Sequence, residues 1–436
     1  LAKNELGHYE EAIEDFNEAI KLNPKDAVLF NDRGIARHEL GLYEEAIKDY
    51  NKALDLNNED SFPYFNRAIT NESLGRYEDA IDDINVIIKL IPQHKNGFHY
   101  RGKFRMETKQ YEEAIEDFNE AIKLDSQDAL SIYLRGYSKF RSKRYEEAIK
   151  DFNEAIKLNP KDADSYTCRG AANHELGRYM EAIKDYEKAA SLNPKEKTIF
   201  NNLGSLKFQL GKYEEALNHF NKAIKLDPKY CSALSERGFT YFKLMRHKEA
   251  INDYNEAIKL DPKDYGFFNN RAISKYFLKK YEEAIKDYNA AIKLNPKDYL
   301  IYCNRGKAKY FLKKYEEAIK DYNAAIKLNP KDYLIYCNRG KAKYFLKKYE
   351  EAIKDYNAAI KLKSENVYEN AYAFIIRGEA KGKLFKYVEA LKDFKKAATF
   401  LKSKIQINPE KDDYEIIKEK VKELLSNSQW LYVDPI

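Results

Sequence analysis

Apolar residues recur along this chain with the spacing that places them on one face of a helix. In the segment over residues 315–328 they stand at i, i+3, i+4, i+7, i+10 and i+11, as Tyr315, Ala318, Ile319, Tyr322, Ala325 and Ile326. Charged and polar residues fill most of the positions between them, so the segment predicts an amphipathic helix. The pair Asn329–Pro330 follows, and because proline disfavours a helical conformation in the residue before it, we expect the helix to end there.

Another helix is predicted before each segment of this kind. Its expected N-caps are aspartates that follow a Pro-Lys or similar turn: Asp26, Asp60, Asp128, Asp162, Asp264, Asp298 and Asp332. Eight residues into the helix stands Gly or Ala, which we expect to let another backbone come close. The two helices are joined by a short turn that contains Gly in some places (Gly7, Gly41, Gly75, Gly177, Gly211) and Lys in others (Lys109, Lys143, Lys279, Lys313, Lys347). Because Lys replaces Gly, a left-handed backbone is not expected to be obligatory in this turn.

The two-helix pattern repeats every 34 residues, and residues 310–343 are identical to residues 276–309. A tyrosine that opens the YEEAI segment, here called the marker, recurs at this interval; His247 replaces it once, and the last marker follows after 38 residues. The markers are Tyr9, Tyr43, Tyr77, Tyr111, Tyr145, Tyr179, Tyr213, His247, Tyr281, Tyr315, Tyr349 and Tyr387. Such self-similarity indicates a solenoid, in which each unit buries its apolar face by stacking on its neighbours.

With Gly306, Tyr315, Ala318, Tyr322, Ala325 and Pro330 at these offsets, the unit closely resembles the tetratricopeptide repeat (TPR). The resemblance covers residues 1 to about 402. It implies an all-α fold, a right-handed α–α superhelical solenoid of helix-turn-helix units, whose first helices line a concave groove that binds peptide segments of partner proteins.

The expected array covers residues 1–402. It has a partial first unit at 1–26, and further units start near residues 27, 61, 95, 129, 163, 197, 231, 265, 299, 333 and 367. Four residues, about one helical turn, are inserted between Leu362 and Arg377. Residues 403–436 are expected to form a capping helix with polar outer residues, over 412–426, and a tail that holds Trp430. This Trp, the only one in the chain, either packs onto the cap or offers a short motif to another molecule.

One departure from the family pattern carries physical information. Ten residues before the marker, where the family usually has Leu, ten units have Arg; six residues after the marker, ten units have Asp. The single unit with Leu203 in the first place has His219 in the second. This joint loss predicts an ion pair within each unit, because an Arg on an apolar face needs a partner and its fork fits a carboxylate. The predicted pairs include Arg271–Asp287, Arg305–Asp321 and Arg339–Asp355.

Candidate peptide-binding residues lie on the first helices. Eleven residues before the marker, five units have Asn: Asn66, Asn202, Asn270, Asn304 and Asn338. Some TPR superhelices hold a peptide backbone with inward asparagines at this place, and one amide offers both a donor and an acceptor. The alternative is that Asn-Arg-Gly is only a habit of this repeat subtype. Beside these asparagines, amines and aromatic faces are expected in the groove at Lys307, Lys341, Tyr310 and Tyr344, although packing between first helices explains some of the rings.

Other functions find less support. The carboxylate clamp of chaperone-binding TPR domains needs a Lys twelve residues before the marker, and no unit has it. The seven histidines share no spacing typical of metal or nucleophile chemistry, and the carboxylates recur in every unit as a solvated face. We therefore expect no enzyme activity, no metal and no cofactor.

Charge is unevenly distributed along the chain, whose overall net charge is +6. Residues 1–128 hold 16 Lys and Arg against 28 Asp and Glu, a net of −12, and residues 129–436 have a net of +18. Either the solvated faces have drifted, or the basic part attracts acidic segments of protein partners. Nucleic-acid binding is not inferred, because lysines in the KKYEEAIKD segments alternate with acids.

The expected location is a reducing compartment such as the cytoplasm, since the four cysteines show no pairing motif. No apolar run approaches the length of a membrane span. The chain begins at Leu1, inside a helix and without an initiating Met, so we interpret it as a fragment whose targeting sequence is not visible.

Two functions of different class follow from these observations. The first is a scaffold that binds peptide segments of partner proteins in the groove. The alternative is a recognition or regulatory region of a larger enzyme or secretion factor. A purely structural spacer of recently duplicated units is a third interpretation. The oligomeric state is not indicated by the sequence.

Overall fold

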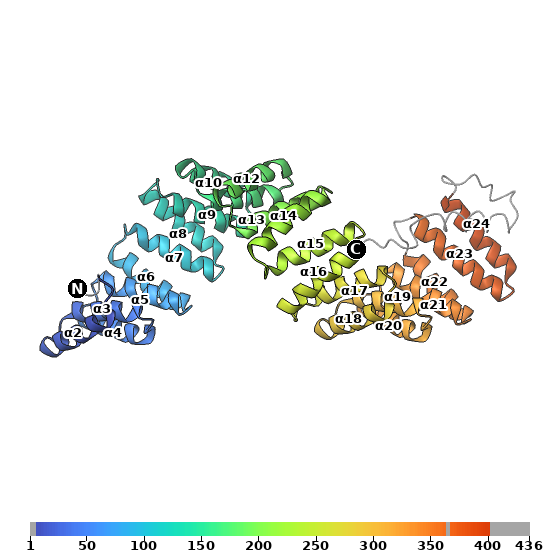
Figure 1. Ribbon diagram of the computed structural model, residues 1–436, viewed down its shortest axis with the longest axis horizontal. Coiled ribbons are helices and arrows are strands. Elements are labelled where there is room, and N and C mark those ends of the chain that lie inside the picture. The colour runs from blue at the N-terminus through green and yellow to red at the C-terminus, as the bar shows by residue number, and fades with distance from the viewer. Residues whose placement is uncertain (1–5, 363–366, 402–436) are drawn as a thin grey trace. The chain divides into compact units, whose positions relative to one another are not determined.

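The computed structural model describes residues 6–362 and 367–401, and these residues form 23 helices joined by short turns (Figure 1). No strand occurs in this part of the chain. Helices of two kinds alternate: first helices, and second helices that begin at a marker residue. The prediction of an all-α array of helix pairs is therefore confirmed. The predicted cap and tail lie outside the described residues.

The helices form two compact units, one over residues 1–210 and one over residues 211–436. The helices of the first unit are α2 (Tyr9–Leu22), α3 (Ala27–Glu39), α4 (Tyr43–Leu56), α5 (Ser61–Ser73), α6 (Tyr77–Leu90), α7 (Lys95–Glu107), α8 (Tyr111–Leu124), α9 (Ala129–Arg141), α10 (Tyr145–Leu158), α11 (Ala163–Glu175), α12 (Tyr179–Leu192) and α13 (Lys197–Gln209). Those of the second unit are α14 (Tyr213–Leu226), α15 (Cys231–Lys243), α16 (His247–Leu260), α17 (Tyr265–Phe277), α18 (Tyr281–Leu294), α19 (Tyr299–Phe311), α20 (Tyr315–Leu328), α21 (Tyr333–Phe345), α22 (Tyr349–Leu362), α23 (Val367–Lys383) and α24 (Tyr387–Leu401).

Odd-numbered elements are first helices. Inside each unit, a first helix packs against the second helices before and after it, and successive first helices contact one another, as α3 contacts α5 and α19 contacts α21. The four inserted residues lengthen one element: α23 has 17 residues, where α21 has 13.

Local signals set the helix ends. All seven aspartates predicted as N-caps accept a hydrogen bond from a backbone N–H of the following helix; for example, Leu300 donates to Asp298 at 2.9 Å. At the other end, α20 stops at Leu328, immediately before the Asn-Pro pair. These predictions are confirmed because a cap and a proline act within a few residues.

The expectation for the turn between the two helices is wrong. Five lysines and also Met245 and Phe385 adopt φ between 57° and 63°, which is the left-handed conformation that the glycines also adopt. In the turn after α19, Lys314 N–H donates to Lys309 O at 2.9 Å and Lys313 N–H donates to Tyr310 O at 2.8 Å. These bonds close the helix end, so the turn imposes the conformation even where a side chain makes it costly.

The small residue of the first helix has a different neighbour from the one expected. A Cβ added at Gly306 would lie 2.7 Å from Cε1 of Tyr322, and at Gly340 it would lie 3.0 Å from the ring of Tyr356. These rings belong to the second helix of the same repeat and are almost fully buried. The small residue therefore makes room for an aromatic ring, and no backbone atom is among its nearest neighbours at these two positions.

Each arginine ten residues before the marker lies against the aspartate six residues after it. Between α19 and α20, Arg305 Nε and Nη2 donate to the two oxygens of Asp321 at 2.9 and 2.6 Å. The Arg side chain is 17% exposed and the Asp side chain 5%, so both charges are largely removed from water. The same fork joins Arg271 to Asp287 and Arg339 to Asp355.

A third residue, which the sequence analysis missed, completes this contact. Arg305 Nη1 donates to Asn289 Oδ1 at 2.7 Å, so one guanidinium joins α18, α19 and α20. All ten arginines contact an Asn of the preceding second helix in this way. We call the set of Arg, Asp and Asn the arginine bridge. Because it spans two repeats, it fixes how each repeat stacks on the one before it.

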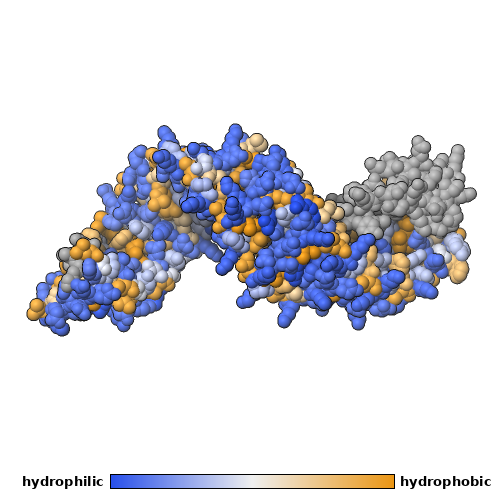
Figure 2. Space-filling model, in the orientation of Figure 1, coloured by the Kyte–Doolittle hydropathy of each residue, from blue (hydrophilic) through white to orange (hydrophobic). Residues whose placement is uncertain are grey.

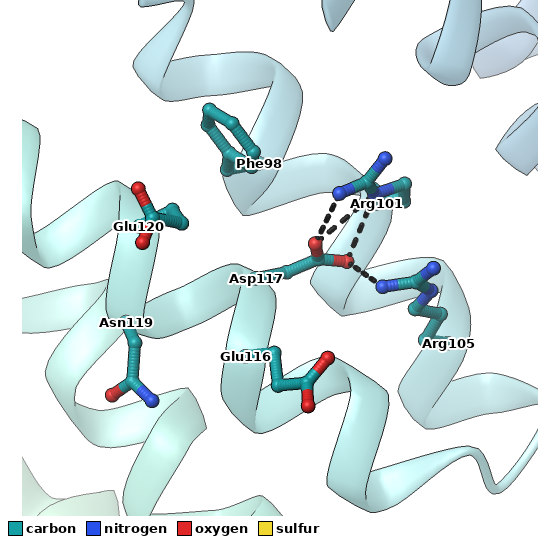
Figure 3. A pocket seen from close by; sticks show the side chains of 7 residues that line it. All are labelled: Phe98, Arg101, Arg105, Glu116, Asp117, Asn119 and Glu120. Carbon is teal, nitrogen blue, oxygen red and sulfur yellow. Dashed lines mark hydrogen bonds and ion pairs between the residues drawn. The ribbon is translucent and has the colours of Figure 1, made fainter.

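Most arginine bridges hold a further cation on the aspartate. Figure 3 shows Arg101 and Arg105 of α7 pointing at Asp117 of α8, with N···O distances of 2.6 and 2.7 Å. In the repeat with Leu203 and His219, the Asn of the bridge is also replaced, by Glu187. The three members of the bridge are therefore lost together, as expected if they act as one group.

We predict that Asp321→Ala lowers the free energy of unfolding by about 3–5 kcal/mol, because it leaves a buried guanidinium without its carboxylate. Asn289→Ala removes one hydrogen bond and is expected to cost about 1 kcal/mol. Glu316→Ala, on the exposed face of α20, serves as the control and should change stability by less than about 0.5 kcal/mol. Urea unfolding measures these differences, and hydrogen exchange locates them; an Asp321→Ala loss equal to that of the control contradicts the assignment.

Candidate peptide-binding surface

The predicted site residues of the second unit lie on successive first helices. We call the exposed and half-buried side chains of α17, α19, α21 and α23 the first-helix face. Each of these helices contacts the next, so residues at equivalent positions form rows across the repeats. All nine residues predicted to bind peptide are half-buried in the structure. Figure 2 shows polar residues over most of the visible surface, with hydrophobic residues in scattered patches between them.

The row of asparagines is partly engaged with neighbouring repeats. Asn338 Nδ2 lies 3.9 Å from Cys303 Sγ, and in the first unit Asn66 Nδ2 donates to Asn31 Oδ1 at 2.9 Å. Both contacts join a residue eleven before the marker to a residue twelve before the marker in the preceding repeat. An amide has two donor hydrogens and an acceptor oxygen, so each contact leaves hydrogen-bonding capacity for another group. Asn202, Asn270 and Asn304 occupy the same position and are equally half-buried.

Lys341 was expected beside aromatic faces, but the sequence did not indicate which rings it contacts. Its Nζ lies 5.3 Å from the centroid of the Tyr310 ring and 5.9 Å from that of Tyr372, so side chains from α19, α21 and α23 meet at one point. Among the described residues, no carboxylate forms an ion pair with this ammonium. Burial lowers the pKa of Lys341 below its usual 10.5, while the two ring faces favour the charged form. Lys341 is thus a cation held by rings and not by an acid.

The lysine two positions further on has the opposite environment. Lys343 Nζ lies 2.9 Å from Asp355 Oδ2 and 3.6 Å from Glu351 Oε2, and its side chain is 12% exposed. The corresponding Lys275, Lys309 and Lys381 form the same ion pairs. These lysines support the arginine bridge. Lys343 on the same helix has acidic partners and Lys341 has none. The lack of an acidic partner is therefore specific to the position of Lys341.

The predicted aromatic residues belong to a continuous series of ring contacts. Phe311 lies 5.7 Å from the centroid of Tyr276 and 5.6 Å from that of Tyr310, and Phe345 lies 5.7 and 5.8 Å from those of Tyr310 and Tyr344. Tyr310 and Tyr344 were predicted from the sequence, whereas Phe311 and Phe345 were not. Their signal was visible: a Phe follows the Tyr directly in three successive repeats. Lys307 and Tyr310 lie one turn apart on α19, and Lys341 and Tyr344 on α21.

An open hollow of about 460 Å³ lies beside α7 and α8 in the first unit (Figure 3). It is lined by Phe98, Arg101, Arg105, Glu116, Asp117, Asn119 and Glu120. Arg101 and Arg105 both donate to Asp117 in an arginine bridge, so this hollow lies on the outside of a structural contact. It is not our candidate site.

The described part of the chain gives little indication of chemical sites of other kinds. It contains no group of three His, Cys, Asp or Glu residues placed to hold a metal ion. None of its helices combines the length and the apolar character that a membrane span needs. The four cysteines are free, and burial raises the pKa of Cys168 to about 11.

Comparison with protein families identifies the class. A model described as TPR repeat matches residues 1–41, 136–177, 204–244, 274–312 and 310–346. Models described as tetratricopeptide repeat match residues 27–60, 96–128, 163–196, 231–264 and 333–366. The chain belongs to the tetratricopeptide repeat family. No curated protein matches it.

Several solved structures are similar to this chain. A tetratricopeptide repeat protein from Parabacteroides merdae is 22% identical, with 60% of this chain and 98% of that chain covered and a TM-score of 0.45. YrrB, described as a TPR protein with an unusual peptide-binding site, is 23% identical, with coverage of 42% and 95% and a TM-score of 0.36. The APC/C hetero-tetramer Cut9–Hcn1 is 15% identical, with coverage of 96% and 94% and a TM-score of 0.43. None of these similarities identifies a partner for this chain.

The two lysines of α21 predict stability losses of different size for the same substitution. Lys343→Met should lower the free energy of unfolding by about 1–3 kcal/mol, because Asp355 loses a buried hydrogen-bonded cation. Lys341→Met should change it by less than about 1 kcal/mol, because the desolvation cost of the ammonium disappears along with its ring contacts. Urea unfolding of the two variants tests this, and equal losses would contradict it.

The lowered pKa of Lys341 predicts that the stability of the protein depends on pH. Because the pKa of Lys341 is lower in the folded state than in the unfolded chain, the unfolded state binds more protons as the pH approaches 10.5. This residue therefore makes the protein more stable as the pH rises within the alkaline range below 10.5. Lys341→Met should remove that increment, whereas an unchanged alkaline profile would show that the ammonium is not desolvated.

Proposed function

We propose that this chain is a protein-interaction scaffold that binds an extended peptide segment of a partner protein along the first-helix face of α17, α19, α21 and α23. The observation that carries the proposal is the Lys341 ammonium, which three successive first helices hold without an acidic partner. Membership of the tetratricopeptide repeat family supports the general role, since such repeats mediate interactions between proteins. The peptide, its position and its chemistry are our inference.

Electrostatics favours an acidic peptide. A half-buried ammonium between two rings has lost part of its hydration, and a carboxylate that enters beside it gains more from the contact than it would in water. The charge of the surrounding sequence also favours an acidic ligand, because residues 129–436 carry a net charge of +18. We infer that Lys341 pairs with an Asp or Glu side chain of the ligand.

The asparagines supply the remaining polar contacts. Asn304 on α19 and Asn338 on α21 stand in equivalent positions of adjacent repeats, and each amide can both donate to a peptide carbonyl and accept from a peptide N–H. Such hydrogen bonds recognise the backbone of the peptide and not its side chains. The face would therefore accept many sequences, provided that an acidic residue reaches Lys341.

The test uses peptides selected on the intact chain from a random display library and measures their affinity by fluorescence anisotropy. We expect the selected peptides to be enriched in Asp and Glu. Lys341→Met should weaken their binding about tenfold or more, in line with a charge-assisted contact of about 1.5–3 kcal/mol. Asn304→Ala combined with Asn338→Ala should also weaken it, by at least about fivefold.

Lys320→Met is the matched control, because it removes an exposed lysine from the second helix α20. It should leave the affinity within about twofold of the original value. Equal effects of Lys341→Met and Lys320→Met would show that only net charge matters and would contradict a specific site. Selection of peptides without acidic residues would contradict the assigned chemistry.

A further inference from the structure

The turns of the second unit keep a backbone conformation that their side chains make costly. From residue 245 onward, five successive turns between a first and a second helix place a non-glycine residue at a φ of 57° to 61°: Met245, Lys279, Lys313, Lys347 and Phe385. Glycine adopts this conformation without a steric penalty, and Gly41, Gly75, Gly177 and Gly211 do so in corresponding turns elsewhere, where Lys109 and Lys143 are the exceptions. All five of these side chains are exposed, and of the five only Phe385 has a ring contact, with Tyr387 at 6.2 Å. The left-handed backbone costs free energy at these residues, and their side chains add little packing in return. This combination suggests that the side chains have a function.

Exposed aromatic rings lie beside these turns. Phe311 is 38% exposed and Phe345 50% exposed, each at the end of a first helix. Each ring stacks on the marker tyrosine of the preceding repeat: Phe311 on Tyr281 at 5.4 Å, and Phe345 on Tyr315 at 5.5 Å. Neighbouring rings therefore hold Phe311 and Phe345 in place, while the remaining part of each ring is exposed to solvent.

The lysines of the turns after α19 and α21 are unpaired. Lys313, Lys314, Lys347 and Lys348 are exposed, and none of them forms an ion pair with a described residue. The first unit differs at the equivalent place, where an arginine of one turn pairs with a glutamate of the preceding repeat. These pairs are Arg76–Glu44, Arg144–Glu112 and Arg178–Glu146, with N···O distances of 2.5, 2.8 and 2.5 Å. Within the second unit, Arg246 still lies 3.9 Å from Glu214 and pairs with Glu249, and Lys280 pairs with Glu283. The turns after α19 and α21 differ from these, because their lysines are available to another molecule.

We propose that Phe311, Phe345 and the lysine pairs Lys313–Lys314 and Lys347–Lys348, here called the turn-edge surface, bind an acidic segment of a partner protein that also carries aromatic or large aliphatic side chains. Two rings and four cations alternate along the surface, so a complementary ligand must alternate apolar groups with carboxylates. This surface consists of turns and of the last residues of α19 and α21. It adjoins the part of the first-helix face that holds Lys341, because Phe345 contacts the Tyr310 ring.

A protein segment fits better than an anionic membrane. Glu316, Glu317, Glu350 and Glu351 are exposed in the first turns of α20 and α22, directly after the lysine pairs. A uniformly negative surface would bring its charge against these glutamates as well as against the lysines. A peptide can place its carboxylates on the lysines alone, which is why a discrete pattern of charges is favoured here.

The experiment measures fluorescence anisotropy of the full chain with labelled twelve-residue peptides that contain six Asp or Glu and two Trp at different spacings. The same peptides with Lys in place of the acids are the negative probes. We expect binding of at least one acidic peptide and of no basic one. Phe311→Ser with Phe345→Ser should weaken that binding at least fivefold.

The decisive variant is Lys313→Gly with Lys347→Gly. Glycine relieves the left-handed strain, so this variant should unfold at a higher temperature and yet bind the acidic peptide at least fivefold more weakly. Loss of binding then cannot come from loss of folding. Lys109→Gly with Lys143→Gly makes the same backbone change in the first unit, at φ of 63° and 62°. That control should also raise the unfolding temperature but leave the affinity unchanged.

Three results would overturn the proposal. The first is an affinity that is the same in the Lys313→Gly, Lys347→Gly variant as in the original chain. The second is a loss of binding in Lys341→Met as large as in the turn variants, because it would place the peptide on the first-helix face. The third is binding to vesicles of phosphatidylserine and phosphatidylcholine that exceeds peptide binding and is lost in the same turn variants, which would assign the surface to a membrane.

Discussion

The structure depends on one contact, the arginine bridge, which recurs in ten repeats. A repeat of two short helices has no core of its own and is stable only when it stacks on its neighbours. Apolar packing provides most of the attraction, but it tolerates small shifts between helices. A guanidinium that donates to an Asp of its own repeat and to an Asn of the repeat before it accepts very few relative positions. The bridge therefore adds geometric definition to the attraction that burial supplies.

The bridge also explains why two groups of cations stand out. The arginine and aspartate of each bridge are paired, and Lys343 and its equivalents are paired as well. Against this background, the ammonium of Lys341 between two tyrosine rings and the lysines of the turn-edge surface have no acidic partner in the described chain. Because the structural charges of the bridges are paired so consistently, cations without an acidic partner are candidates for binding another molecule. Both groups belong to the near-identical repeats of the second unit, and both favour acidic ligands.

Much of the fold could be predicted from the sequence, because its determinants are short-range or strictly periodic. The helix pairs, the aspartate caps and the residues of the Arg–Asp contact all follow from spacing within a single repeat. The Asn of the bridge could have been found in the same way, since its replacement by Glu187 coincides with Leu203 and His219. The left-handed conformation of the turn lysines was not predicted, because lysine disfavours this conformation. The backbone hydrogen bonds that close the turn impose it nevertheless.

The candidate site was harder to predict. Lys341 meets residues 31 positions away in both directions, and the second of them, Tyr372, lies in a repeat whose period is broken by four inserted residues. Such contacts between repeats are not visible in the short windows from which helices are predicted. Half-burial of the predicted asparagines and lysines also depends on how neighbouring first helices pack.

Hydrogen–deuterium exchange of the intact chain, with and without a saturating selected peptide, tests the central claim most directly. The account predicts that protection increases in the first helices α19, α21 and α23 around Lys341 and not in the second helices α18, α20 and α22. Protection confined to the second helices, or no change in any helix at saturation, would contradict it.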